Sequence, residues 1–420
     1  MDPLKKISKG SKIIFLGMAL TVIINYVFRI VISKLGKAEY GLYSLGFATI
    51  EVAAIISLIG LHIGGVRYIS LFKAKGEKLK AERVIRSEIK IVAIVSVVVA
   101  FLLYIFAEKI STIFFHEPGL TPILKLFIFA LPFYSLSQIC ISIMLAYQHI
   151  KKMVIIGDLL QGLAKIILTV ILILLGYKIA GVILAVILSF ILIFIYSYSY
   201  IRKMVNFKWI KEKIDWEVVY FSIPLMISSI ALVIMKWADS FMIGYFLNIE
   251  QVGIYNVAVP TALLLTVFIR PLHLIFYPVI TEIVALKKSI KHIHKTVVRW
   301  VLAINIPLAL ILIIFSKKII IFLFGQEYAT AALTLSILAF FYFLDSIMIL
   351  NKALLSIFKK TKEMAVIVVF ALIINIILNW FLIPLWGIIG AAIATGSSIL
   401  IIQILYLIFF YKLKKEGLYF

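Results

Sequence analysis

Charged side chains inside long apolar stretches are the residues of this sequence with the clearest capacity for chemistry. Bases outnumber acids among them, and the set comprises Arg29, Lys165, Lys236, Arg270, Lys352, Glu51, Asp239 and Asp345. If these stretches span a bilayer, a charge at its centre costs roughly 3 kcal/mol or more and needs a wet cavity or a partner. Arg binds phosphate through paired hydrogen bonds and Lys binds it as a point charge. The excess of bases therefore predicts a cationic cleft for an anionic group.

The candidates for binding that anionic substrate are Arg270, Lys165, Arg29 and Lys236. Arg270 lies between Pro260 and Pro271, and prolines permit a bent helix that faces water, which favours a cavity role. Lys165 follows Asp158 and Gln161 at helical spacing, so it either continues a polar stripe or pairs with Asp158 on the same helix.

The other bases also keep two interpretations. Arg29 shares a helical face with Asn25, and it either lines the cleft or snorkels outward. Lys236 stands three residues before Asp239, so these two either pair on one helix or serve the function. Lys352 lies close to the predicted cytoplasmic end of its span, where snorkelling accounts for it.

The acidic residues at similar depth are candidates for counter-ions or for coupling transport to an ion, namely Glu51, Asp239 and Asp345. Glu51 either carries a proton or neutralises Arg29 on the neighbouring span, and we favour the second interpretation. We expect no metal site and no bound cofactor, because Cys140 is the single cysteine and no metal-binding motif occurs. Coupling to the membrane potential, H⁺ or Na⁺ stays open.

Uncharged polar residues at helical spacing predict a wet interior. On its wall we place Gln138, Asn25, Asn375 and Asn379. Such amides either bind sugar hydroxyls or join helices to one another, where each contributes about 0.6 kcal/mol.

The elements that must position these residues are membrane-spanning helices. The chain has 420 residues, of which 64% are hydrophobic, whereas soluble domains have about 45–50%. A spanning helix needs roughly 20 apolar residues, and the sequence contains about twelve such stretches. We therefore predict an all-α polytopic membrane protein with spans near 11–32, 42–63, 89–107, 123–147, 153–175, 179–200, 218–246, 253–280, 297–315, 332–355, 364–384 and 387–410.

The basic residues between these spans predict the orientation. With the N-terminus inside, about 30 of them fall on the cytoplasmic side and about 7 on the other. Both termini are therefore expected in the cytoplasm, with the chain in the cell membrane. The net charge of +23 marks this cytoplasmic face, where it suits anionic lipid headgroups rather than nucleic acid.

The two halves of the chain resemble each other. LGKAEYGLY at 35–43 matches LNIEQVGIY at 247–255, and EKISTIFF at 108–115 matches KKIIIFLF at 317–324. We predict two lobes of six helices each, at residues 1–210 and 211–420, related by a pseudo-two-fold axis along the membrane normal. Transporters bind substrate at such a repeat interface and rock their halves for alternating access. The alternative is a duplicated scaffold without transport.

Several local patterns carry a family resemblance across both halves. They are LGKAEYGLYSLG at 35–46, ADSFMIGYFLNIEQVGIYNVA at 238–258, YPVITE at 277–282, LFGQEYATA at 323–331 and NIILNWFLIPLWGIIGAAIATGSS at 375–398. In this ordered set the chain resembles the polysaccharide flippases of the multidrug, oligosaccharidyl-lipid, polysaccharide (MOP) exporter superfamily. The resemblance implies two six-helix lobes of the MATE kind around a central cleft.

The same resemblance implies export of a lipid-linked oligosaccharide, carried on a polyprenyl (pyro)phosphate, for cell-surface glycan synthesis, with glycan-assembly proteins as further partners. A multidrug or cation antiporter of the same superfamily is the alternative, but the internal excess of bases disfavours a cationic substrate. A polytopic saccharide polymerase or ligase is the alternative from another class. We expect no enzyme, because the outer loops are short and apolar, and no Walker A pattern for ATP occurs.

Overall fold

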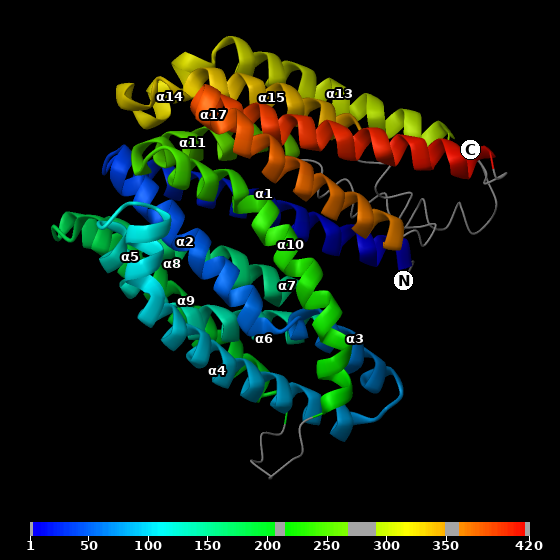
Figure 1. Cartoon of the computed structure of the whole chain (residues 1–420). Helices are drawn as coiled ribbons and strands as arrows, with labels where there is room; N and C mark the ends of the chain where they lie inside the picture. The colour runs from blue at the N-terminus through cyan, green and yellow to red at the C-terminus, as the bar shows by residue number, and fades with distance from the viewer. Residues whose placement is uncertain (1–2, 206–214, 268–290, 349–360, 416–420) are drawn as a thin grey trace. The chain divides into compact units, whose positions relative to one another are not determined.

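The computed structural model describes residues 3–205, 215–267, 291–348 and 361–415, where all regular secondary structure is helical (Figure 1). The predicted all-α class is confirmed. The chain forms two compact units, one of Met1–Leu35 with Glu39–Trp237 and one of Gly36–Ala38 with Ala238–Phe420. Their boundary falls inside helix α10 (Trp216–Phe246). The predicted boundary between the sequence halves, at 210–211, lies outside the described residues.

The first unit combines long α-helices with short α-helices and two π-helical turns. In chain order they are α1 (Pro3–Ser33), α2 (Lys37–Leu58), α3 (Leu61–Ala74), α4 (Lys78–Lys109), the π-helix η1 (Ile110–Phe114), α5 (Leu120–Ile128), α6 (Leu131–Ala146), α7 (Ile150–Met153), the π-helix η2 (Val154–Leu160), α8 (Gln161–Leu174), α9 (Lys178–Arg202) and most of α10.

The second unit begins with the end of α10. It continues with α11 (Ile249–Ala262), the 3₁₀ turn η3 (Leu263–Thr266), α13 (Lys291–Ile314), α14 (Ser316–Phe324), the 3₁₀ turn η4 (Gln326–Tyr328), α15 (Ala331–Ile347) and α17 (Thr361–Lys415). Asn248 starts α11, because its side-chain oxygen accepts a hydrogen bond from the backbone N–H of Gln251.

Two of the breaks between helices have clear local causes. Helices α5 and α6 together cover the predicted span 123–147 and meet at 46°. Pro132 lies in the first turn of α6, where a missing N–H does no harm and a new helix can begin. Within α17 the chain turns at Gly387, whose φ of 58° suits glycine. This turn separates the predicted spans 364–384 and 387–410.

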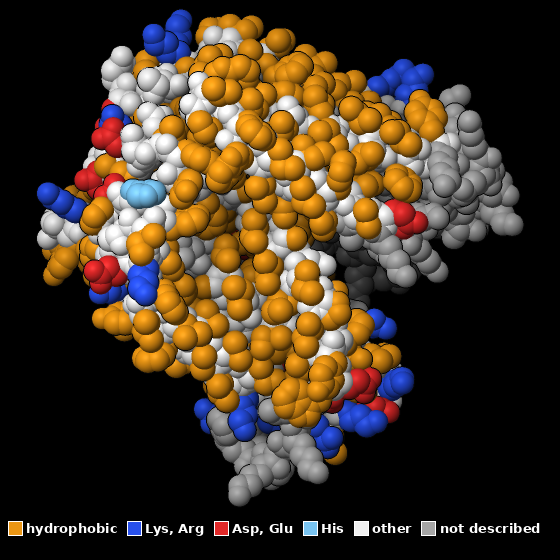
Figure 2. All heavy atoms as spheres, in the orientation of Figure 1, with side chains coloured by type: hydrophobic (Ala, Val, Ile, Leu, Met, Phe, Trp, Pro, Cys, Tyr) orange, Lys and Arg blue, Asp and Glu red, His pale blue; other side chains and the backbone are white. Residues whose placement is uncertain are grey.

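The outer surfaces of these helices are apolar enough for lipid. In the described residues seven helices could cross a membrane by length and composition, or eight if the bent α5–α6 pair is one span. The prediction of about twelve is compatible with this number, because α17 alone covers two predicted spans. Figure 2 shows hydrophobic side chains over most of the visible face, with charged ones gathered at its margins. Phe101 and Leu174, exposed by 65% and 81%, belong to such lipid-facing surfaces.

Helix α10 packs closely against α3 within the first unit. Gly60 precedes α3 with a φ of 72°, and a Cβ there would lie 2.2 Å from the backbone oxygen of Ser222. A Cβ on Gly64 would lie 2.0 Å from the Ser222 Oγ. At Gly60 the backbones of the two helices are so close that only glycine fits.

We expect Gly60→Ala to destabilise the protein far more than Gly76→Ala. Both glycines have positive φ, 72° and 74°, so each substitution costs about 1–2 kcal/mol in backbone strain. Nothing lies within 4 Å of a Cβ at Gly76, whereas the one at Gly60 meets backbone. This overpacking adds about 1–3 kcal/mol. Thermal unfolding of the purified variants measures the difference. Equal midpoints would show that α10 moves away from residue 60 at no cost in stability.

Candidate functional site

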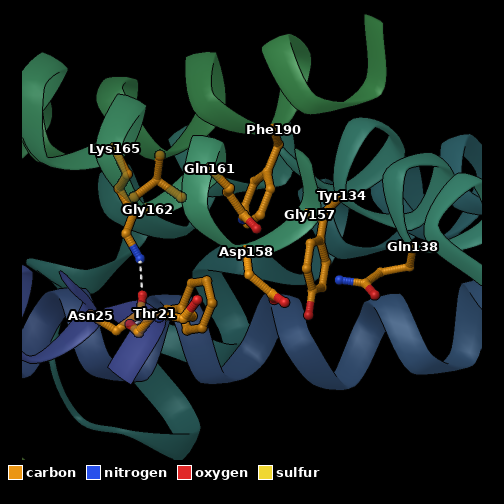
Figure 3. A pocket seen from close by; sticks show the side chains of 12 residues that line it. Thr21, Asn25, Tyr134, Gln138, Gly157, Asp158, Gln161, Gly162, Lys165 and Phe190 are labelled. Carbon is orange, nitrogen blue, oxygen red and sulfur yellow. Dashed lines mark hydrogen bonds between the residues drawn. The ribbon is translucent and has the colours of Figure 1, made fainter. Parts of the chain in front are cut away.

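A polar pocket lies inside the first unit, walled by α1, α2, α6, η2, α8 and α9 (Figure 3). Its volume is about 170 Å³. Its hydrogen-bonding side chains are Thr21, Asn25, Tyr134, Gln138, Asp158, Gln161 and Lys165. Three predicted site residues, Asn25, Gln138 and Lys165, therefore come together here from three different helices.

The wide turn η2 brings Asp158 to this pocket. A π-helix places one extra residue in its turn, and such turns are frequent at functional sites. Asp158 lies in η2, and Gln161 and Lys165 lie on the α8 helix that continues from it. All three side chains line the pocket, as the sequence stripe predicts.

Lys165 is bound to a neutral partner. Its Nζ donates a hydrogen bond of 2.8 Å to the Asn25 Oδ1 and lies 4.2 Å from the centre of the Phe28 ring. The Asn25 Nδ2 donates to the Thr21 carbonyl oxygen, which turns the amide oxygen toward the ammonium group. The hydrogen bond of Lys165 therefore goes to Asn25 of another helix, not to Asp158 of its own stripe. Its positive charge remains available to a ligand.

The Arg29 side chain also points toward the other helices of the first unit. Its Nη1 donates to the Tyr40 hydroxyl at 3.2 Å, across from α1 to α2. The side chain is only partly exposed, and its hydrogen bond is directed at a neighbouring helix rather than outward. Arg29 and Lys165 are thus two cations of one unit whose hydrogen-bond partners are neutral.

Lys236 pairs with Glu51 and not with Asp239. Its Nζ lies 2.7 Å from the Glu51 Oε2, and the Trp237 Nε1 donates to the same oxygen at 2.7 Å. The ion pair of Glu51 is with Lys236, whereas the hydrogen bond of Arg29 goes to Tyr40, and the interpretation of Glu51 as a counter-ion to Arg29 stays a prediction. The Glu51 carboxylate instead holds two consecutive residues of α10. Trp237 in turn packs edge-on against Phe47, which lines the pocket, with ring centres 6.3 Å apart.

Asp239 forms a separate buried cluster in the second unit. Its carboxylate accepts hydrogen bonds from the Tyr255 hydroxyl, the Thr395 hydroxyl and the Asn379 Nδ2. The Asn379 Nδ2 also donates to the Asn375 Oδ1 at 3.1 Å, and both amide residues are buried. Asn379, expected on a cleft wall, is therefore a partner of Asp239, and Asn375 joins the same cluster through Asn379 and Thr395. The Asn379 Oδ1 is buried and has no hydrogen-bond partner within the described ranges.

The remaining predicted residues are placed as follows. Asp345, on α15, accepts a hydrogen bond from the Gln403 Nε2 of α17 within the second unit. Arg270 and Lys352 lie outside the described residues.

Some polar residues at the site were not among the predicted site residues. Thr21 stands four residues before Asn25, and Tyr134 four before Gln138, so helical spacing alone connects both to the pocket.

Glu88, which lies elsewhere in the first unit, was not predicted as a buried charge because the predicted span began at residue 89. It is 1% exposed against Gly65, and neither carboxylate oxygen has a hydrogen-bond partner in the part of the chain that the structure describes.

Comparison with solved structures shows which known fold the chain shares. An inward-facing multidrug resistance MATE family transporter of the MOP superfamily matches with a TM-score of 0.76 and 14% identity, over 96% of this chain and 99% of that one. The lipid II flippase MurJ matches with a TM-score of 0.70 and 18% identity, over 93% and 87%. At such identities the likeness shows the fold, and this fold is the predicted MATE-like one.

The chain belongs to the polysaccharide biosynthesis protein family, whose family model matches residues 7–284. A MatE family model matches residues 224–381. The resemblance drawn from the sequence is confirmed, and the chain is a membrane transporter of the polysaccharide flippase group of the MOP superfamily.

Two further relatives come from archaea. The uncharacterized membrane protein MJ1068 of Methanocaldococcus jannaschii is 26% identical over 98% of this chain and 85% of its own length. The probable low-salt glycan biosynthesis flippase Agl15 of Haloferax volcanii is 27% identical over 43% of this chain and 39% of its own.

Proposed function

We propose that this transporter moves a lipid-linked oligosaccharide, carried on a polyprenyl (pyro)phosphate, across the cell membrane by alternating access. The observation that carries this proposal is the pair of cations Lys165 and Arg29, both held in the first unit by neutral partners. An anionic lipid-linked oligosaccharide, with negative charge on its (pyro)phosphate or on its sugars, can bind to such cations. Family membership and the flippase relative from Haloferax volcanii support a glycan substrate.

The setting of this activity belongs to the same proposal. Both termini lie in the cytoplasm, so the headgroup enters from the cytoplasmic leaflet while the lipid tail stays in the bilayer. The product serves glycan synthesis at the cell surface, in contact with glycan-assembly proteins. Translocation itself needs no catalytic residue, and the relatives with named functions are transporters and flippases.

An ion gradient or the membrane potential drives the cycle in this proposal, and Asp239 is our candidate for ion coupling. Glu51 already has a cationic partner, whereas the hydrogen-bond partners of Asp239 are neutral. The carboxylate and the unpartnered Asn379 Oδ1 offer the oxygen ligands that hard cations prefer. Transport that depends on Na⁺ or on a proton gradient in the wild type, and loses this dependence in Asp239→Asn, would support the assignment.

Reconstitution into liposomes tests the proposed function. We expect the wild-type protein to translocate a fluorescent polyprenyl-pyrophosphate oligosaccharide, measured as probe that becomes accessible to a membrane-impermeant quencher. Protein-free liposomes provide the background. Failure to translocate this probe, together with ion-driven efflux of an organic cation from the same preparation, would assign the chain to the drug-exporting branch instead.

A further inference from the structure

We propose that the pocket around Lys165 is a subsite for one sugar residue that bears a carboxylate, such as a hexuronate, within the transported oligosaccharide. This inference rests on the proposed function and adds the chemical class of sugar that the transporter selects. The pocket lies wholly within the first unit and is walled by its own helices.

The size of the pocket fits a single sugar ring. Its volume is about 170 Å³. That space is comparable to one monosaccharide and too small for a pyrophosphate together with the sugars attached to it. The rest of the headgroup would therefore lie outside this pocket.

The side chains of the pocket suit hydroxyl groups better than phosphate. A phosphate only accepts hydrogen bonds from a protein at neutral pH, so a site built for it consists of donors. Here the Asp158 carboxylate, which accepts hydrogen bonds and carries negative charge, lines the pocket together with the amides Gln138 and Gln161. Sugar hydroxyls both donate and accept, so they are compatible with the carboxylate and with both amides.

Aromatic rings provide the apolar part of the same site. Tyr134 and Phe190 both line the pocket, and their ring centres lie 4.6 Å apart at an interplanar angle of 47°. The C–H face of a pyranose packs on such rings, while the Tyr134 hydroxyl offers one more polar contact. The pocket therefore combines polar side chains with two aromatic rings.

Lys165 adds the requirement for negative charge. In Figure 3, Lys165 and Asn25 lie on one side of the pocket, Tyr134 and Gln138 on the other, and Asp158 between them. The ammonium group has three donors, of which Asn25 takes one. A carboxylate on the sugar would accept the others and neutralise a charge that has no acidic partner among the described residues. A sugar bound in this way places its hydroxyls toward Asp158 and Gln138.

Ligand binding to the purified full-length protein in nanodiscs tests this inference. The probes are methyl β-glucuronide, methyl β-glucoside and inorganic pyrophosphate, followed by saturation-transfer NMR and calorimetry. We expect the glucuronide to bind about tenfold or more tightly than the glucoside, because a charge-assisted hydrogen bond is roughly twice as strong as a neutral one. Lys165→Gln should remove this preference and Lys165→Arg should keep it. Lys80→Gln, on an exposed part of α4, should leave it unchanged.

Each other result decides against the subsite. Equal binding of the two glycosides by the wild type, or a preference that survives in Lys165→Gln, would overturn the role of the charge. Tight binding of pyrophosphate that Lys165→Gln abolishes, without glucuronide binding, would make the pocket a phosphate site. The liposome assay keeps the two proposals apart. Translocation without a glucuronide preference refutes the subsite alone, and glucuronide binding without translocation of any lipid-linked saccharide refutes the proposed function alone.

Discussion

Replacement of Asp239 by alanine is expected to lower the free energy of unfolding by about 3 kcal/mol. A buried donor left without an acceptor costs about 1–3 kcal/mol, and partial rearrangement of the three donors keeps the total below the sum of their separate costs. The donors concerned are the Tyr255 hydroxyl, the Thr395 hydroxyl and the Asn379 amide. They come from α11 and α17, so the carboxylate joins three helices of the second unit. Thermal or denaturant unfolding in detergent measures the loss.

Two matched variants give this prediction its control. Asp239→Asn keeps an acceptor oxygen but turns an NH₂ group toward donors, so we expect an intermediate loss. Ser240→Ala removes a buried hydroxyl one residue away that accepts one hydrogen bond from Asn256 at 2.9 Å. Because the same Asn256 Nδ2 also donates to the Val252 carbonyl oxygen, its cost should be about 1 kcal/mol or less. Equal losses in Asp239→Ala and Ser240→Ala would show that the cluster does not hold the helices together.

The sequence was sufficient for the fold because the membrane imposes a simple rule. Every spanning segment must form hydrogen bonds to its own backbone N–H and C=O groups, so an apolar run of sufficient length becomes a helix. The exceptions lie where local geometry decides. The bend between α5 and α6 follows Pro132 only in hindsight, and the π-turn that carries Asp158 leaves no periodic signal. The side chains of the pocket were recognisable by spacing, whereas their partners were not.

The partners escaped because they come from distant parts of the chain. Lys236 and Asp239 are neighbours on one helix by the rule of three and four residues. In the structure Lys236 bonds to Glu51, 185 residues away, and Asp239 bonds to Asn379, 140 residues away. Helical spacing tells which residues share a face, but only packing tells what that face meets. Glu51 illustrates the point, because its two partners are consecutive residues of α10.

Reversal of the charge at Glu51 is expected to reduce translocation to near the background of protein-free liposomes. In Glu51→Lys the new ammonium group faces Lys236, and the Trp237 Nε1 loses its acceptor. Trp237 packs on Phe47, so the loss reaches the wall of the pocket that holds Lys165. Lys236 is 52% exposed but Glu51 only 14%, so the unfolding midpoint of each variant should be measured beside its transport.

The double variant Glu51→Lys with Lys236→Glu separates the ion pair from the individual residues. It restores opposite charges across the same gap, so translocation should recover well above that of Glu51→Lys alone. Recovery should remain partial, because a lysine cannot accept the Trp237 N–H. Glu51→Gln, which keeps an acceptor for Trp237 but removes the charge, should retain more activity than Glu51→Leu. If the double variant transports no better than Glu51→Lys, the contact with Trp237 and not the ion pair is what shapes the pocket wall.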